Sequence, residues 1–284
     1  MRFAFIDAKK AEHDVAILCR VLQVQRSGYY AWCSREEPER EREDRRLVVE
    51  LRAVFAEKKR RYGSPRLCRE LRTRGTYVGR HRVARLMREQ HLRARPRRKF
   101  VKTTDSNHGL STPPNVLDRE FHVEEPNRVW AGDVTYLPTL EGWLYLAVLL
   151  DLHSRRVVGW AMSEHNDEAL TLAALQMAID QRQPAPGLVH HSDRGTTYAS
   201  GTYQDVLAQH GMVCSMSRKG NCWDNAVVES FFSTLDIECV DGRPFSSRSV
   251  GRREVVEYIL GFYNPTRLHS SLGYMSPMEF ERAA

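Results

Sequence analysis

An apolar segment with one acidic residue in its middle constrains the fold of this chain more than any other feature. Residues 129–137 read Val-Trp-Ala-Gly-Asp-Val-Thr-Tyr-Leu, a pattern that predicts a buried strand with Asp133 inside it. A carboxylate that is buried without a partner is strongly destabilising. Because no Lys or Arg is adjacent to Asp133 in the sequence, a bound cation is a natural partner for it.

Two further carboxylates lie in settings that suit the same site. Asp193 ends a second apolar run within residues 188–195, where a predicted strand gives way to a glycine turn. Glu229 lies on a helix predicted over residues 224–235, with 35 residues between it and Asp193. Carboxylate oxygens are the ligands that Mg²⁺ prefers, so the three acids predict one metal site built from three elements. The alternative is that Asp133 and Asp193 are structural salt-bridge partners.

Five sequence motifs occur in a fixed order around these acids. Together they resemble the orfB-type transposases of insertion sequences, whose DDE catalytic core is similar to that of retroviral integrases. The resemblance extends from Val15 to Phe280, nearly the whole chain. The motifs are residues 130–136 (WAGDVTY), 151–160 (DLHSRRVVGW), 191–195 (HSDRG), 217–232 (SRKGNCWDNAVVESFF) and 263–269 (YNPTRLH).

The residues alone indicate metal-dependent phosphodiester chemistry, because two Mg²⁺ ions about 3.5–4 Å apart can clamp the attacking and the leaving oxygen. We expect Asp133, Asp193 and Glu229 to be both catalytic and metal-binding, with Asp133 bridging both ions and Mn²⁺ able to substitute. The resemblance implies the remainder of the activity. The implied activity is that of a polynucleotidyl transferase, which cleaves transposon ends and then transfers the free 3′-hydroxyl strand to other DNA, in DNA transposition, integration and recombination.

The resemblance also implies partners for the chain. These are the DNA of the element ends and of the target, a homo-oligomer that holds two ends together, and an upstream-frame transposase subunit or fusion. Two other functions stay open: a non-catalytic DNA-binding regulator derived from a transposase, and an RNase H-like nuclease without strand transfer.

Charge is distributed unevenly along the chain. Residues 1–102 carry 29 Lys and Arg against 13 Asp and Glu, whereas residues 103–284 carry 14 against 23. This asymmetry predicts a polyanion partner for the first half. The alternative for the basic helix over residues 80–91 is a solvated face. The residues expected to contact DNA are Arg80, Arg82, Arg85, Arg88, Arg95, Arg97, Arg98, Lys99 and Lys219.

The order of apolar periodicities predicts two kinds of domain. From residue 126 onward the order is βββαβαβα, which is typical of an RNase H-like mixed five-stranded sheet flanked by helices, an α/β fold. An all-α region with a helix-turn-helix over about 64–91 comes before it. The expected domains are a basic DNA-binding region (1–102), a linker (103–124), an RNase H-like integrase core (125–240) and a C-terminal helical extension (241–284).

Composition excludes some classes of protein. With 42% hydrophobic and 28% charged residues, the chain has the composition of a soluble globular protein. Its longest apolar stretch, residues 143–152, is too short to span a bilayer, and the N-terminus lacks a signal peptide. We therefore expect a cytoplasmic, nucleoid-associated protein without a membrane partner. The six cysteines form no CxxC pair, which favours reduced thiols.

Several local expectations follow from single residues. Ser64 should cap the first helix of the helix-turn-helix, and Asp224 and Asn225 should cap the Glu229 helix. A break is expected within the first helical module at residues 27–30. Asp151 should cap a turn opposite Arg155 and Arg156 rather than bind metal. Of His190 and His191, one should lie in the core and the other make a polar contact, with metal ligation as the alternative.

One position departs from the pattern of the resembled family. Its members usually carry Lys or Arg seven residues after the catalytic Glu, on the same face of the helix. Here that position is Asp236, which would repel the phosphates of DNA instead of binding them. This leaves open whether the departure impairs activity or whether Lys219, Arg243 or Arg267 supplies the cation.

Overall fold

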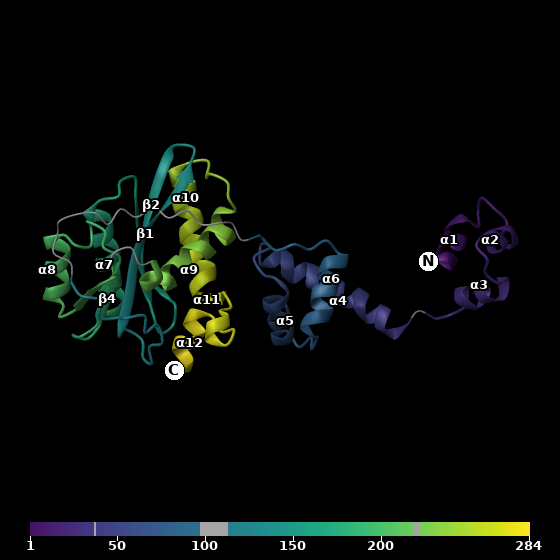
Figure 1. Ribbon diagram of the computed structural model, residues 1–284, viewed down its shortest axis with the longest axis horizontal. Coiled ribbons are helices and arrows are strands. Elements are labelled where there is room, and N and C mark those ends of the chain that lie inside the picture. The colour runs from purple at the N-terminus through teal and green to yellow at the C-terminus, as the bar shows by residue number, and fades with distance from the viewer. Residues whose placement is uncertain (37, 97–112, 219–221) are drawn as a thin grey trace.

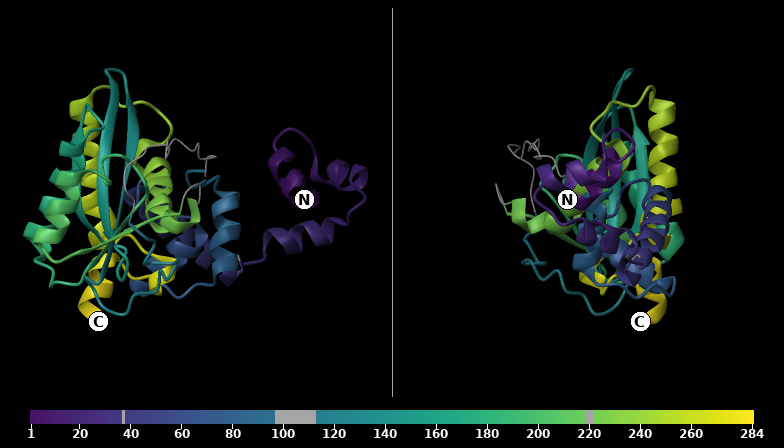
Figure 2. Two further views of the ribbon diagram at one scale, coloured as in Figure 1. Left: turned by 60° about the vertical axis from the view of Figure 1, so that its left-hand side comes forward. Right: turned by 90° about the vertical axis from the view of Figure 1, so that its right-hand side faces the viewer.

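The computed structural model describes residues 1–36, 38–96, 113–218 and 222–284. Figure 1 and the left view of Figure 2 show three groups of elements along an elongated molecule. Three short helices at the N-terminus lie at one end, helices α4–α6 lie in the middle, and a sheet with its covering helices forms the other end. Within the described residues, no helix has the length and apolar character needed to cross a membrane.

The first group has a small core of its own. It consists of α1 (Arg2–Lys9), α2 (Val15–Val21) and α3 (Arg26–Cys33). The break predicted at residues 27–30 is wrong, because these residues lie inside α3 and the chain turns before it. Gly28 is a packing residue, since a Cβ there would lie 3.2 Å from the Phe3 ring. The buried side chains of this group are Ile6, Leu18, Cys19 and Tyr29.

The middle group contains the helix-turn-helix. Helices α5 (Ser64–Thr73) and α6 (Arg80–Glu89) pack against the longer α4 (Glu39–Glu57). The apolar side chains of these helices are buried, among them Leu51, Leu71 and Leu86. The predicted N-cap is wrong: Gly63 takes the extended cap conformation, and Ser64 is already helical with Pro65 in the first turn.

The five-stranded sheet has the order β3-β2-β1-β4-β5. The strands are β1 (Val129–Thr139), β2 (Gly142–Asp151), β3 (Val157–Ser163), β4 (Val189–Ser192) and β5 (Val213–Met216). The first three pair as an antiparallel meander, while β4 lies parallel to β1 and β5 parallel to β4. The predicted mixed sheet of the RNase H-like α/β fold is therefore confirmed.

Alternation of side chains along the strands gives the sheet two apolar faces. On β2, Leu146 and Val148 belong to one core cluster, whereas Ala147 and Leu149 belong to the other. Figure 1 shows different helices on the two sides of the sheet. Helices α7 (Glu168–Arg182) and α8 (Gly201–Gln209) cover one face. The other is covered by α9 (Ala226–Leu235), α10 (Arg248–Val256) and a π-helical segment (Glu257–Tyr263), after which α11 (Asn264–Thr266) and α12 (Pro277–Ala283) follow in the chain.

Candidate functional site

The pairing of β1 with β4 places two of the predicted acids next to each other. Gly132 of β1 pairs in parallel register with Ser192, the last residue of β4, so Asp133 of β1 lies beside Asp193, the residue that follows β4. Neighbouring strands lie about 4.8 Å apart, which brings the two carboxylates to one edge of the sheet. Asp133 shares its face of β1 with Ala131, which belongs to the core that α9 covers.

Helix α9 brings the third acid toward this edge. It packs against β1, and its buried side chains, among them Val228 and Phe232, leave Glu229 half-buried. Burial raises the pKa of Asp133 well above its usual range, and the negative charge of Asp193 and then that of Glu229 raise it further. The three carboxylates thus influence one another electrostatically across the segments that carry them.

The three acids form a donor set of the kind that a divalent cation requires. Oxygens of three acids suit Mg²⁺, and a desolvated carboxylate with like charges nearby is stabilised by a cation. Asp133 accepts one hydrogen bond from the Val134 amide (2.8 Å), and Asp193 accepts one from the Gly195 amide (2.9 Å). In the part of the chain that the structure describes, no three His, Cys, Asp or Glu side chains are close enough to hold one ion jointly. The chemistry of these donors, three carboxylates with one of them desolvated, is nevertheless of the kind that suits a divalent cation.

The two histidines of β4 are part of the protein interior. His190 contacts the Tyr203 hydroxyl at 2.9 Å, and burial lowers its pKa to about 3. Both ring nitrogens of His191 contact hydroxyls, those of Ser215 (2.9 Å) and Ser217 (3.2 Å). Burial lowers the pKa of His191 to about 4. Both imidazoles are therefore neutral at pH 7, and both lie in the core.

Asp224 holds the polypeptide around the start of α9. Its buried carboxylate accepts hydrogen bonds from the amide and guanidinium of Arg218, from Arg119 and from Asn115, at 2.9–3.0 Å. The Arg218 hydrogen bond is the largest cause of its lowered pKa. The predicted capping role is wrong for Asp224. Asn225 occupies the cap position, but its side chain donates to the Gly132 carbonyl instead.

We predict that Asp224→Asn lowers the free energy of unfolding by about 1–3 kcal/mol at pH 7, because one amide oxygen cannot replace two charged acceptor oxygens. Since Arg119 and Arg218 are half-exposed, we expect the lower end of this range. The pKa of Asp224 is lowered by folding, so this stability is present above the unfolded pKa and is lost as the pH falls below it. Urea denaturation at several pH values should show that the difference in free energy of unfolding between the wild type and Asp224→Asn becomes smaller below about pH 4.

The matched control is Asp118→Asn, which removes an exposed partner of the same Arg218. It should change stability by less than about 1 kcal/mol. Equal losses in both variants would contradict the anchoring role of Asp224.

Asp151, the last residue of β2, has a structural role as predicted. Its buried carboxylate accepts hydrogen bonds from the amides of Asn127, His153 and Ser154. Asp151 also faces Arg155 and Arg156 across the turn as predicted: its amide donates to the Arg156 carbonyl (2.9 Å), and its carbonyl accepts from the Arg155 amide (2.8 Å). The guanidinium of Arg182 lies 3.9 Å from its carboxylate. The guanidinium of Arg155 donates to the Phe121 carbonyl at 2.9 Å.

The basic residues expected to contact DNA have different surroundings. Arg80 and Arg88 are exposed on α6. Arg82 and Arg85 both form ion pairs with Asp44 of α4, and Arg95 donates to the Glu238 carbonyl at 2.8 Å. Arg97, Arg98, Lys99 and Lys219 lie outside the described residues. Arg119, half-exposed beside Arg218, was not predicted, because its surrounding sequence carries no helical or strand periodicity.

Comparisons with known proteins agree with this architecture. An HTH-like domain model matches residues 41–100, and two integrase core domain models match residues 123–222 and 210–277. The chain is 45% identical over 283 residues to transposase InsF for insertion sequence IS3A of Escherichia coli (strain K12), covering 99% of this chain and 98% of that protein. It is 44% identical to the insertion element IS600 uncharacterized 31 kDa protein of Shigella sonnei, covering 93% and 97%. A solved HTLV-2 integrase catalytic core domain in complex with magnesium is more distant, with 17% identity, a TM-score of 0.42 and coverage of 55% of this chain and 97% of that one. The chain therefore belongs to the insertion-sequence transposases of the InsF type, with an HTH-like region followed by an integrase core.

Proposed function

We propose that this transposase is a DDE enzyme, which cleaves DNA at the ends of its element and joins the resulting 3′-hydroxyl to target DNA. The observation that carries the proposal is the placement of Asp133 on β1 beside the end of β4, which Asp193 follows, with Glu229 close enough to raise the pKa of Asp133. Three acids that repel one another at a partly buried sheet edge are destabilising unless they serve a cation.

In this proposal Asp133, Asp193 and Glu229 hold two Mg²⁺ ions, which Mn²⁺ could replace. Bound there, the ions would activate the attacking oxygen and offset charge on the leaving 3′-oxygen. Asp133, whose pKa is raised by both of the other acids, would serve both ions. His190 and His191 of β4 are buried and neutral, so they would position β4 rather than exchange protons with DNA.

The test joins labelled end DNA to a target plasmid in the presence of Mg²⁺. A transposase should give both a nicked end with a 3′-hydroxyl and a joined product, and neither should form in EDTA. A nuclease without strand transfer would give the nick alone. A regulator would bind the end without cutting it, and that result would overturn the proposal.

We further propose that α6 contacts DNA through Arg80 and Arg88. The double variant Arg80→Gln/Arg88→Gln should weaken duplex binding and reduce the slope of log affinity against log salt by about two, one for each lost phosphate contact. Fluorescence anisotropy over a salt series measures this slope. Thermal stability should be unchanged, because both side chains are exposed. By contrast, Arg82→Gln/Arg85→Gln should also destabilise the protein, because it breaks the pairs with Asp44. An unchanged salt slope in the first variant would contradict the proposal.

We also propose how the chain is divided into domains and what it assembles with. The DNA-binding region would be residues 1–102, followed by a linker (103–124), the catalytic core (125–240) and a C-terminal extension (241–284). The DNA partners would be the element ends and the target, in the cytoplasm at the nucleoid. Two ends must be held together for transposition, so we propose a homo-oligomer on DNA, made either alone or as a fusion with an upstream-frame subunit.

A further inference from the structure

A cavity of about 380 Å³ lies where the helix-turn-helix region meets the catalytic core. One wall comes from α5, through Arg66, and another from α9, through Ser230 and Thr234. Other lining residues lie between Tyr263, at the end of the π-helical segment, and Ser271. The cavity contains none of the three acids of the proposed active site, so its role is separate from theirs.

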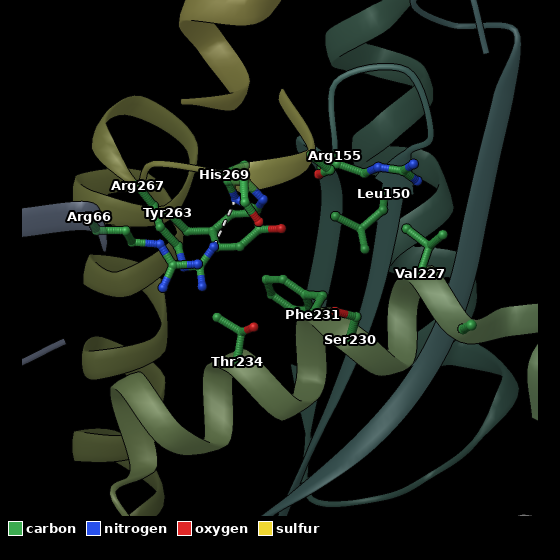
Figure 3. A pocket seen from close by; sticks show the side chains of 13 residues that line it. Arg66, Leu150, Arg155, Val227, Ser230, Phe231, Thr234, Tyr263, Arg267 and His269 are labelled. Carbon is green, nitrogen blue, oxygen red and sulfur yellow. Dashed lines mark hydrogen bonds between the residues drawn. The ribbon is translucent and has the colours of Figure 1, made fainter. Parts of the chain in front are cut away.

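The cavity is strongly cationic. It is lined by Arg66, Arg155 and Arg267, and none of the described residues that line it is acidic. Figure 3 shows the guanidinium groups of Arg66 and Arg267 at one end of the cavity, and Arg155 at the other. The nearest carboxylate is that of Glu238, a buried residue that is paired with Arg267 at 2.8 Å. One carboxylate therefore serves two adjacent guanidinium groups.

Arg66 is the less compensated of these two cations. Its Nε donates to the Leu268 carbonyl at 2.8 Å, but its Nη1 lies 3.9 Å from Glu238, beyond hydrogen-bond distance. Arg267, in contrast, donates twice to Glu238 and contacts His269 through Nη1. The Nη groups of Arg66 thus retain hydrogen-bonding capacity directed at the cavity.

Four side-chain hydroxyl groups line the cavity. Ser230, Ser270 and Ser271 are exposed, and Thr234 is half-exposed. Within the described part of the chain, no internal hydrogen bond is formed by these four hydroxyls. A guanidinium and several hydroxyl donors without internal hydrogen bonds, lining the same cavity, match a tetrahedral oxyanion, which offers acceptor oxygens in several directions.

We propose that this cavity binds a phosphate group, with Arg66 as the principal ligand and the hydroxyls of α9 and of Ser270–Ser271 as secondary donors. The phosphate could belong to a DNA backbone or to a free phosphate compound. In either case its binding would link α5 to α9 and to the C-terminal segment, and so connect the DNA-binding region with the core. The inference does not depend on the proposed catalysis.

The experiment titrates the full-length chain with inorganic phosphate and pyrophosphate by calorimetry, and with a labelled DNA duplex by fluorescence anisotropy. Arg66→Gln should weaken pyrophosphate binding about tenfold or more, because it removes a charge-assisted hydrogen bond. Thr234→Val should weaken it about threefold, since it removes one neutral donor. The matched control is Arg69→Gln, which removes the same charge from the exposed side of α5, where Arg69 contacts Tyr274. It should leave pyrophosphate binding unchanged.

The DNA arm identifies the source of the phosphate. If it belongs to a DNA backbone, Arg66→Gln weakens duplex binding more than Arg69→Gln does, and pyrophosphate competes with the duplex. If it belongs to a free compound, only the calorimetric titrations change. Should Arg66→Gln fail to fold, as judged by circular dichroism, Thr234→Val keeps the Arg66 contacts and decides the question. The proposal is overturned if no phosphate probe binds, or if the cavity variants bind every probe as the wild type and Arg69→Gln do.

Discussion

Asp133→Asn is expected to lower the rate of DNA-end cleavage at least about a thousandfold in Mg²⁺, because loss of a metal ligand removes several kcal/mol of transition-state stabilisation. Asp193→Asn and Glu229→Gln should have effects of the same order. Each replacement keeps the shape of the side chain and removes its charge. Binding of end DNA should be unchanged, because the proposed DNA contacts on α6 lie on another part of the chain. The measurements are a cleavage assay and a binding titration on the same labelled duplex.

Stability of the metal-free protein supplies a second readout that separates a lost ligand from a misfolded variant. The pKa of Asp133 is raised by folding, because its neutral carboxyl group is more stable in the folded state than its charged carboxylate. Asp133 therefore stabilises the folded state at low pH, and this stability is lost as the pH rises through the folded pKa. Asp133→Asn removes the charged carboxylate. Without divalent ions, the variant should therefore be at least as stable as the wild type at pH 7. Added Mg²⁺ or Mn²⁺ should raise the melting temperature of the wild type and not that of the variant.

A matched control is Asp180→Asn, which neutralises an exposed acid near the end of α7, on the other face of the sheet. It should leave cleavage, DNA binding and metal-induced stabilisation unchanged. Retention of more than about a tenth of wild-type cleavage by any of the three acid variants would contradict the proposed ligand set, because a tenfold loss corresponds to only about 1.4 kcal/mol.

The parts of the fold that the sequence predicted well are those dominated by apolar periodicity. The strands containing Asp133 and Leu149 are long and apolar, so both their existence and their antiparallel pairing could be anticipated. Helix ends were predicted less well. Gly28 and Ser64 have the local chemistry of a break and a cap, but Gly28 lies inside α3 in close contact with Phe3, and Gly63 takes the cap position before Ser64.

The surroundings of the candidate site could be predicted only in part. The positions of the three acids followed from motifs within single elements. The partners of Asp224 did not, because Arg119 and Asn115 come from a segment about a hundred residues earlier in the chain. The same holds for the cavity, in which Arg66 and Arg267 are brought together by tertiary packing alone. Sequence spacing says nothing about such contacts, since they depend on how α5 docks on the C-terminal segment.

The second large effect is expected at the buried ion pair beside that cavity. Glu238→Gln should lower the free energy of unfolding by about 3–5 kcal/mol, the usual cost of leaving one buried charge unpaired. Arg267 is 4% exposed and Glu238 is 3% exposed, and the Tyr258 hydroxyl also donates to this carboxylate. The carbonyl of Glu238 accepts from Arg61 and Arg95 as well, so the residue connects the basic first half of the chain with the core. Urea denaturation of the metal-free protein measures the loss.

Arg267 decides whether the loss comes from an unpaired charge or from a general disturbance of packing. In the double variant Glu238→Gln/Arg267→Met both charges are absent, so we expect it to be more stable than Glu238→Gln alone. A matched control is Glu257→Gln, which breaks an ion pair with Lys59 in which both side chains are about half exposed. Solvent screening makes that pair worth less than about 1 kcal/mol. If Glu238→Gln costs no more than Glu257→Gln, or if the double variant is the least stable of the three, the loss does not come from an unpaired buried charge.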